Sequence, residues 1–276
     1  MINEKIPISY DGYREKANIE TFLYKRSPEI NIKNRPLILI CPGGGYEFLS
    51  DREGESIAFQ FNAMGYHAAI INYSIKPVTY PTQLLETASA VKYFKDNAEK
   101  YDIDPSKIAI YGASAGAHAA ALFSTGYFRK EVTDILKVSE DYLKPAGMIL
   151  AYPVITSGPK AHVGSFENLL GNQKDDPELR KYVSIENRIT RETPPAFIWH
   201  TFPDDCVPME NSLLLAEAMK KENIPFEFHV FPTGGHGLAL ANDITLSPWG
   251  HELDEGASQW ISLVKNWLQR LFGPIK

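Results

Sequence analysis

The stretch K-I-A-I-Y-G-A-S-A-G-A-H at residues 107–118 constrains the fold of this chain more than any other. Its apolar run Ile108–Tyr111 predicts a buried strand and its alanine-rich run Ala115–Leu122 predicts a helix, so a tight turn must join them. The turn reads G-x-S-x-G, which places Ser114 on a strained strand-to-helix corner with its hydroxyl clear of the sheet. The N–H of Ala115 then opens the helix without an intrahelical partner, directed at the place where an oxyanion would form.

A match of five residues also occurs in Gly/Ser loops that have no chemical role. The context decides between the two interpretations. A strand pattern precedes the turn, a helix pattern follows it, and suitable partner residues lie downstream. These neighbours favour a nucleophilic serine.

Strand and helix patterns alternate on both sides of this turn. Such alternation predicts the α/β class, with a mostly parallel central sheet and helices on both faces. The expected strands lie at residues 37–40, 66–73, 108–111, 146–155 and 196–200, and the expected helices at 53–64, 84–98, 115–122, 210–222 and 257–271. Residues 19–24 predict an antiparallel edge strand, residues 226–230 predict a half-buried strand near the sheet edge, and the more polar residues 126–145 lie outside the alternation.

The length of 276 residues allows one large domain or two smaller ones. We find no internal repeat, low-complexity tract or linker, so we expect a single domain over residues 1–276. Between residues 156 and 193 the alternation lapses for longer than an ordinary loop, apart from a short helix expected at 177–182. A disordered insertion would also explain this, but the apolar side chains in the segment favour a lid.

The chain carries 28 Lys and Arg residues against 34 Asp and Glu residues, a formal net charge of −6, without a basic stretch suited to a phosphate backbone. We therefore expect no nucleic-acid partner. The N-terminus lacks an apolar signal core and no uninterrupted apolar run approaches ~18 residues, so we expect a cytoplasmic protein that does not bind membranes. Cys41 and Cys206 form no C-x-x-C motif and are interpreted as buried apolar residues.

A serine hydroxyl is a weak nucleophile that needs a base oriented by a third group, and the order Ser, acid, His is expected on this kind of sheet. Among seven histidines, His236 lies in a glycine-flanked loop just beyond the last predicted strand, within reach of Ser114. Asp204 and Asp205 both follow the strand that begins near residue 196. One of them must accept the imidazole N–H, and the residues alone leave open which.

Three further histidines, at positions 118, 200 and 251, are interpreted as structural. His118 lies one helical turn beyond Ser114 and is directed away from the oxyanion side. His200, at a strand end, and His251, in a proline-bounded loop, could line the pocket, but a structural role is favoured for both.

Four motifs together carry a resemblance to a known family. They are Gly-Gly-Gly-Tyr at 43–46, Gly-Ala-Ser-Ala-Gly at 112–116, Trp-His-Thr-x-x-Asp-Asp-x-Val-Pro at 199–208 and Gly-Gly-His-Gly at 234–237. In this order the chain resembles the α/β-hydrolase fold and, more narrowly, the bacterial esterases related to acetyl xylan esterases, near the hormone-sensitive-lipase branch. The resemblance extends from about residue 35 to the C-terminus, and residues 167–171 and 183–187 look like the lid of such esterases.

The resemblance implies that Ser114 is the nucleophile, His236 the base and Asp204 the acid. It also implies no metal and no cofactor.

The glycine loop departs from the H-G-G-G of that branch, because Pro42 stands where its histidine usually lies. The loop backbone can still supply N–H donors. The oxyanion role is therefore carried to Gly44 and Gly45 beside Ala115.

The resulting hypothesis is a serine carboxylesterase that releases short acyl groups, chiefly acetyl, from sugars or xylo-oligosaccharides through an acyl-enzyme. Its expected partner is a small-molecule ester, and a homo-oligomer is left open. If the lid covers the strand ends, Tyr46, Phe166 and Tyr182 should narrow the acyl side of the pocket.

Two alternatives stay open. A peptidase or amidase needs the same three residues and an anchor for a peptide terminus, which we cannot identify in the sequence. A non-catalytic binding module could keep this fold, although the intact Ser, Asp, His order argues against it.

Overall fold

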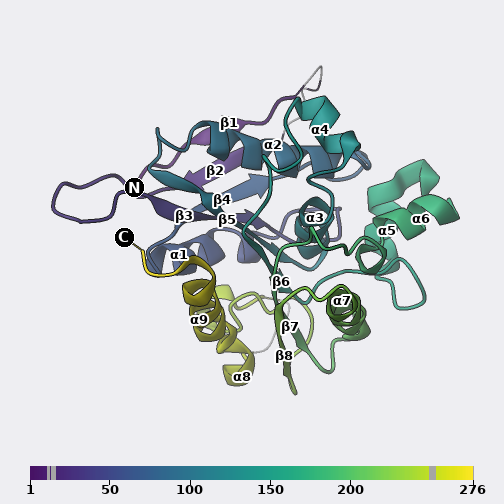
Figure 1. Cartoon of the computed structure of the whole chain (residues 1–276). Helices are drawn as coiled ribbons and strands as arrows, with labels where there is room; N and C mark the ends of the chain where they lie inside the picture. The colour runs from purple at the N-terminus through teal and green to yellow at the C-terminus, as the bar shows by residue number, and fades with distance from the viewer. Residues whose placement is uncertain (11–12, 14–16, 249–252, 276) are drawn as a thin grey trace.

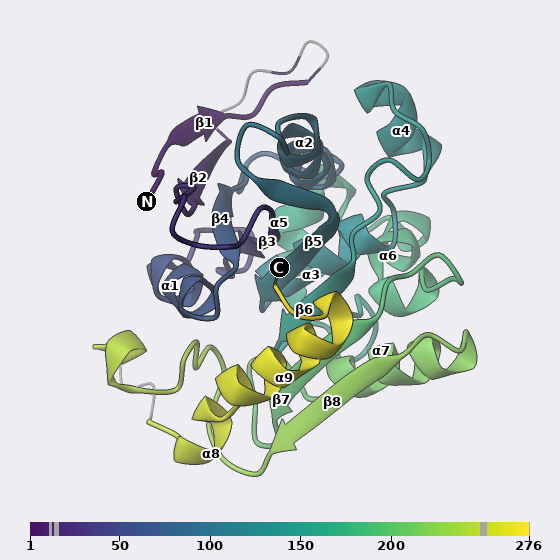
Figure 2. The same ribbon diagram turned by 60° about the vertical axis from the view of Figure 1, so that its left-hand side comes forward.

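The central element of the protein is a twisted sheet whose outermost strands, β1 and β8, lie at opposite edges (Figure 2). The computed structural model describes residues 1–10, 13, 17–248 and 253–275. Within these residues the strands follow the order β1-β2-β4-β3-β5-β6-β7-β8. β1 and β2 pair antiparallel and β2 pairs antiparallel with β4, whereas all strands from β4 to β8 are parallel. The bounds are β1 (Lys5–Pro7), β2 (Asn18–Phe22), β3 (Arg35–Cys41), β4 (His67–Asn72), β5 (Ile103–Ala113), β6 (Gly147–Ala151), β7 (Ala196–Thr201) and β8 (Phe226–Phe231).

Helices cover both faces of this sheet (Figure 1). One apolar layer contains side chains of α2, α3, α4 and α7, and the other contains side chains of α1, α8 and α9. The α-helices are α1 (Glu55–Ala63), α2 (Thr82–Asp96), α3 (Ala115–Ser124), α4 (Lys130–Leu136), α5 (Val163–Leu170), α6 (Pro177–Val183), α7 (Glu210–Lys221), α8 (Glu255–Ser258) and α9 (Trp260–Phe272). Short 3-10 turns are η1 (Asp51–Glu53), η2 (Gly171–Gln173), η3 (Ile185–Asn187) and η4 (Asp243–Thr245).

The central strands contain continuous apolar runs because each strand contributes side chains to both layers. On β3, Leu37 and Leu39 belong to the layer of α2 and α3, whereas Ile38 and Ile40 belong to the layer of α1 and α9. Successive side chains of a strand point to opposite faces, so a sheet covered on both sides needs continuous apolar runs. This confirms the predicted α/β class and its mostly parallel sheet.

The predicted elements reappear with small shifts at their ends. The antiparallel strand expected at residues 19–24 is β2, at Asn18–Phe22, but β1 pairs outside it, so β2 is not at the edge. The three-residue β1 is too short and polar to be recognised from its pattern. The expected closing helix is divided into α8 and α9, and the polar region 126–145 contains α4.

The segment from residue 156 to residue 193 is ordered rather than a disordered insertion. It contains α5, α6 and two 3-10 turns, and Figure 1 shows α5 and α6 beside α3. His118 of α3 holds this segment through a 2.8 Å hydrogen bond from its Nε2 to the carbonyl of Val183. Across the described ranges, no helix combines the length and apolarity that crossing a membrane requires.

Candidate active site

Ser114 lies on the strained corner that the sequence predicts. Its φ of 53° and ψ of −121° are unusual for a residue with a side chain, and such backbone costs on the order of 1–3 kcal/mol. The corner is held by the N–H of Ser114, which donates to the carbonyl of Ala151 at 2.9 Å, and by the N–H of Val154, which donates to the Ser114 carbonyl at 3.2 Å. The end of β6 and the chain after it therefore fix the serine at the end of β5.

The two glycines of the G-x-S-x-G turn are required by close packing. A Cβ on Gly112 would lie 2.3 Å from the carbonyl oxygen of Gly116, and a Cβ on Gly116 would lie 2.1 Å from the carbonyl oxygen of Cys41. Neither contact is tolerable for a side chain. The glycines thus let α3 start directly against β5 and against the end of β3.

Three side chains from three separate strand ends form one hydrogen-bonded chain. His236 Nε2 lies 2.8 Å from Ser114 Oγ, and His236 Nδ1 lies 2.7 Å from Asp204 Oδ2. Because the Asp204 carboxylate only accepts hydrogen bonds, Nδ1 carries the imidazole proton and Nε2 is free to accept the serine proton. The carboxyl ends of parallel strands share one sheet edge, so β5, β7 and β8 deliver these residues to one place.

The two aspartates differ in burial and in their contacts. Asp204 is buried, with its side chain wholly shielded from solvent, whereas Asp205 is exposed. Asp204 Oδ1 accepts hydrogen bonds from the backbone N–H groups of Cys206 at 3.1 Å and Val207 at 2.9 Å. Its Oδ2 accepts from His236 and also from His200 Nε2 at 3.1 Å.

These four donors keep Asp204 ionised. Burial raises the pKa of this carboxyl, but the hydrogen bonds from His200 and His236 outweigh burial and hold the pKa well below its usual range. His200 is itself oriented, since its Nε2 also lies 2.9 Å from the carbonyl of Val207 and its Nδ1 lies 2.8 Å from Ser212 Oγ. The sequence suggested a structural or pocket role for His200; the structure gives it a direct contact with Asp204.

The residues expected to bind an oxyanion lie in the glycine loop and at the start of α3. Gly44 and Gly45 line the same cavity as Ser114, and Ala115 is the first residue of α3. Among the hydrogen bonds within the described part of the chain, none uses the N–H of Gly44, Gly45 or Ala115. These three donors are therefore free to bind a ligand.

A cavity of about 460 Å³ opens at Ser114 and His236. Its wall combines the glycine loop, the turn after it, the segment 156–193 and the loop after β8. The other lining residues are Gly44, Gly45, Glu47, Phe48, Ser50, Arg52, Glu53, His162, Gly164, Asn168, Cys206, Gly237 and Ser247. Burial and the nearby His236 lower the pKa of His162, which favours a neutral imidazole in this wall.

The three aromatic residues expected in the pocket are not part of this wall, so that expectation is wrong. Tyr46 is buried, and its hydroxyl lies 2.7 Å from His118 Nδ1. Phe166 packs edge-on against the same His118 ring with 5.2 Å between centroids. Tyr182 bonds to Glu131 through its hydroxyl, at 2.7 Å.

For Phe166, the physical reason is the amphipathicity of α5, the helix that carries it. Its apolar side turns Phe166 into the core, which leaves Gly164 and Asn168 to meet the cavity. Cys206 was also expected to be buried, but it is exposed and lines the cavity, whereas Cys41 is buried as expected. His251 lies outside the described residues.

Sequence reasoning missed the polar residues that follow the glycine loop. Arg52 and Glu53 lie within ten residues of Gly43, and both reach the cavity. Their nearness to a loop that contacts Ser114 was the available signal. In the part of the chain that the structure describes, no group of three or more His, Cys, Asp or Glu side chains is arranged to hold a metal ion.

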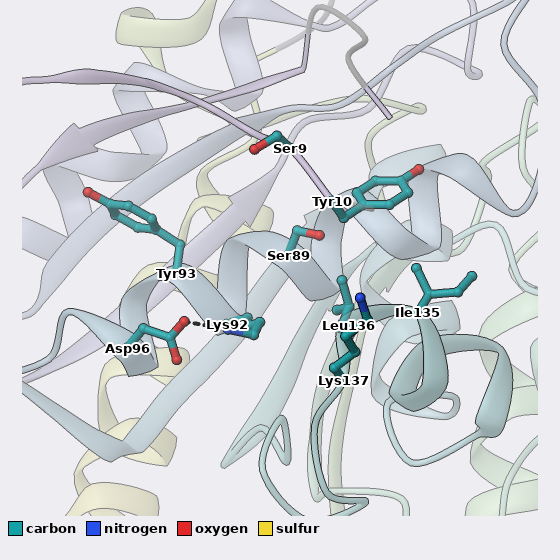
Figure 3. A pocket seen from close by; sticks show the side chains of 9 residues that line it. All are labelled: Ser9, Tyr10, Ser89, Lys92, Tyr93, Asp96, Ile135, Leu136 and Lys137. Atoms are coloured by element: carbon teal, nitrogen blue, oxygen red, sulfur yellow. Dashed lines mark hydrogen bonds and ion pairs between the residues drawn. The ribbon is translucent and has the colours of Figure 1, made fainter. Parts of the chain in front are cut away.

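A second hollow, of about 400 Å³, lies between α2, α4 and the N-terminal segment (Figure 3). Among the nine described residues that line it there is no histidine or cysteine, and its acid, Asp96, is paired with Lys92. The described residues that line it therefore do not form a hydrogen-bonded serine, histidine and aspartate chain like the one beside the Ser114 cavity.

Comparisons with known proteins identify similar chains. The model of the BD-FAE family matches residues 26–219. Endo-1,4-beta-xylanase B of Butyrivibrio fibrisolvens is 39% identical over 236 residues, which are 83% of this chain and 36% of that protein. The acetylxylan esterase of Xylanibacter ruminicola is 28% identical over 262 residues, 93% of this chain and 50% of that protein. The chain thus spans a third to a half of the length of these curated relatives.

Solved structures match over nearly the whole chain. The acetyl ester-xyloside bifunctional hydrolase of Caldicellulosiruptor lactoaceticus superposes with a TM-score of 0.84 at 33% identity, covering 97% of this chain and 96% of that one. The carboxylesterase Cest-2923 of Lactobacillus plantarum gives a TM-score of 0.85 at 28% identity, with 98% of each chain covered. An α/β-hydrolase enzyme from a deep-sea metagenome gives 0.79 at 33% identity, again with 98% of each chain covered. The chain adopts the α/β-hydrolase fold and belongs to the BD-FAE family.

Proposed function

We propose that the protein is a serine carboxylesterase that removes short acyl groups, chiefly acetyl, from sugars or short xylo-oligosaccharides. One observation carries the proposal: the unbroken chain of hydrogen bonds from Ser114 through His236 to Asp204, beside a cavity with free N–H donors. The printed activities of the relatives, an acetylxylan esterase and an acetyl ester-xyloside hydrolase, support the substrate class.

The proposed reaction begins with attack of Ser114 Oγ on the ester carbonyl carbon. His236 Nε2 takes the serine proton as the new C–O bond forms, and the imidazolium that results is stabilised by Asp204 at Nδ1. The carbonyl oxygen becomes an oxyanion, for which the N–H groups of Ala115, Gly44 and Gly45 are the candidate donors. Those donors are fixed in advance by backbone, so they cost no reorganisation during the reaction.

The tetrahedral intermediate then breaks the bond to the alcohol. His236 returns its proton to the leaving alcohol oxygen, and the acyl group stays on Ser114 as an ester. Water enters, gives a proton to His236 and attacks the acyl carbon. His236 then returns the proton to Ser114 Oγ as the bond to the acyl carbon breaks, which releases the carboxylic acid. The same imidazole serves as base and acid in both halves.

Several polar side chains in the cavity wall support a polar alcohol as the leaving group. Asn168 Nδ2 donates to the Gly45 carbonyl at 2.9 Å, and no hydrogen bond within the described residues uses its amide oxygen, which can therefore accept one from a hydroxyl. His162 and Ser50 add further polar groups to the same wall. A sugar hydroxyl can be bound by such neutral donors and acceptors.

The test is ester hydrolysis by the purified full chain. The substrates are p-nitrophenyl acetate, acetylated xylo-oligosaccharides and an aminoacyl p-nitroanilide, and the control is Ser114→Ala. We expect ester hydrolysis that falls by about 10³-fold or more in Ser114→Ala with an unchanged melting temperature, because the lost hydroxyl leaves no core cavity. A folded Ser114→Ala protein with near-normal activity would exclude this mechanism, and a preference for the anilide would indicate an amidase.

A further inference from the structure

A buried carboxylate lies directly behind the proposed active site. Glu53 ends the 3-10 turn η1, and only 3% of its surface is exposed. Its Oε2 accepts the N–H of Gly43 at 2.8 Å, and its Oε1 accepts the hydroxyl of Tyr152 at 2.7 Å. Both oxygens are therefore used by donors that come from different parts of the chain.

The direction of each hydrogen bond requires an acceptor at both oxygens. The Gly43 amide can only donate. The Tyr152 oxygen receives the N–H of Ala239 at 3.0 Å, which leaves its own proton for Glu53. Burial raises the pKa of Tyr152 well above its usual range, so that proton stays on the phenol. A neutral amide at residue 53 would place an NH₂ group against one of two donors.

The Gly43 contact reaches the proposed oxyanion loop. Gly43 is followed by Gly44 and Gly45, which line the cavity. A Cβ on Gly43 would lie 2.5 Å from Glu53 Oε2 and 3.1 Å from Ser114 Cβ, so the loop is held between the carboxylate and the serine. Any movement of Glu53 would shift the loop relative to Ser114.

The Tyr152 contact reaches the proposed base. The Tyr152 ring packs edge-on against His236 with 5.1 Å between centroids, and Ala239, which donates to its hydroxyl, lies three residues after His236. Arg52, the residue before Glu53, also contacts the loop of His236, because its Nη1 donates to the carbonyl of Gly237 at 2.8 Å. One short turn thus contacts both the oxyanion loop and the loop of the base.

We propose that Glu53 is a positioning residue, which sets the oxyanion loop and the His236 loop at the mutual distance that the ester reaction needs. This inference rests on the proposed function. Placement errors near 1 Å can cost about 10²-fold in rate, so a contact that fixes two loops at once has a large effect on kcat. The effect belongs to the transition state, because the oxyanion exists only there.

A matched control comes from α2. Glu86 is also buried, and it accepts hydrogen bonds from the N–H of Ser74 at 2.7 Å, from Ser74 Oγ at 2.6 Å and from the Tyr13 hydroxyl at 3.0 Å. It is absent from the described lining of the Ser114 cavity. Glu86→Gln therefore reports what the loss of a buried, hydrogen-bonded carboxylate does to stability alone.

The experiment compares Glu53→Gln with Glu86→Gln in the full chain. The readouts are kcat and KM for p-nitrophenyl acetate, the inhibition constant of a phenylboronic acid that mimics the tetrahedral intermediate, and the melting temperature. We expect Glu53→Gln to lower kcat by about 10- to 100-fold, to leave KM within about threefold, and to weaken the boronate by a similar factor to kcat. Glu86→Gln should lower the melting temperature while kcat stays within about threefold of wild type.

Equal losses of kcat in the two variants, or a rise in KM alone for Glu53→Gln, would overturn the proposal. If Glu53→Gln fails to fold, Tyr152→Phe keeps the ring against His236 and removes only the hydroxyl bonded to Glu53. It should lower kcat by about threefold or more, and an unchanged kcat would overturn the proposal as well. Failure of the proposed function would appear in the wild-type protein itself, which would neither hydrolyse the ester nor react with a fluorophosphonate at Ser114; that result overturns both inferences.

Discussion

Replacing Asp204 by asparagine should abolish most of the activity because it reverses one hydrogen bond. Asp204 accepts four donors, two from backbone N–H groups at Oδ1 and two from imidazoles at Oδ2. The N–H groups of Cys206 and Val207 can only donate, so the asparagine oxygen must stay with them. Its NH₂ group then faces His236 and His200.

An NH₂ group facing His236 requires Nδ1 to act as an acceptor. The imidazole proton then moves to Nε2, the nitrogen 2.8 Å from Ser114 Oγ, and this nitrogen can no longer take the serine proton. In the Ser-His-Asp template, the same change of tautomer lowers kcat by about 10⁴-fold. That factor corresponds to about 5 kcal/mol of lost transition-state stabilisation.

The assay is kcat/KM for p-nitrophenyl acetate, measured for Asp204→Asn and for Asp205→Asn. The second variant is the matched control, since it removes the same charge from the neighbouring residue, which is exposed. We expect a loss of about 10⁴-fold for Asp204→Asn and less than about threefold for Asp205→Asn. Comparable losses in both variants, or the larger loss at Asp205, would refute the tautomer argument.

Three further predictions follow from the same structure. Removing the second imidazole in His200→Asn should lower kcat by about 10-fold with little change in KM, because Asp204 loses one charge-assisted donor; an unchanged kcat in a folded variant would show that His200 does not orient the carboxylate. Burial lowers the pKa of His118 from 6.5 to about 4, so its neutral form is favoured in the fold. The stability that this neutral imidazole contributes is therefore fully present above pH 6.5 and is lost as pH falls towards 4. This amounts to about 3 kcal/mol of unfolding free energy, and urea titrations at both ends of that range should show a smaller loss in His118→Gln than in wild type; an equal loss would contradict it. Finally, kcat/KM across p-nitrophenyl esters from acetate to laurate should be highest for the short chains, since each methylene that does not fit costs ~1–3 kcal/mol and one cavity of about 460 Å³ must hold both acyl group and alcohol; a maximum at octanoate or longer would point to a lipase-like pocket instead.

The sequence alone predicts the secondary-structure elements that depend only on neighbouring residues. The apolar run, the two glycines and the alanine-rich run around Ser114 predict a strand, a corner and a helix because steric exclusion and side-chain periodicity act over a few residues. The order of the motifs along alternating strands and helices then predicted that Ser114, an acid from residues 204–205, and His236 would meet, since parallel strands end at one edge. The structure brings these residues together as that order requires.

The direction of each side chain, and its contacts with residues far away in the sequence, could be seen only in the tertiary structure. The preference for Asp204 over Asp205 comes from donors on β7, on the loop after β8 and on the local backbone, which converge on one carboxylate. Apolar character alone could not show that Phe166 points into the core rather than into the cavity, because that depends on which side of α5 meets α3.

The contact network of Glu53 shows the same limit most clearly. Its partners Gly43, Tyr152 and, through Tyr152, Ala239 are separated by up to about two hundred residues of chain, and none of them carries a motif that names the others. Hydrogen bonds have no sequence signature when the donor and acceptor are brought together by the packing of separate strands. The sequence determined where the reactive groups lie along the chain, and the packing of the sheet determined which neighbours orient them.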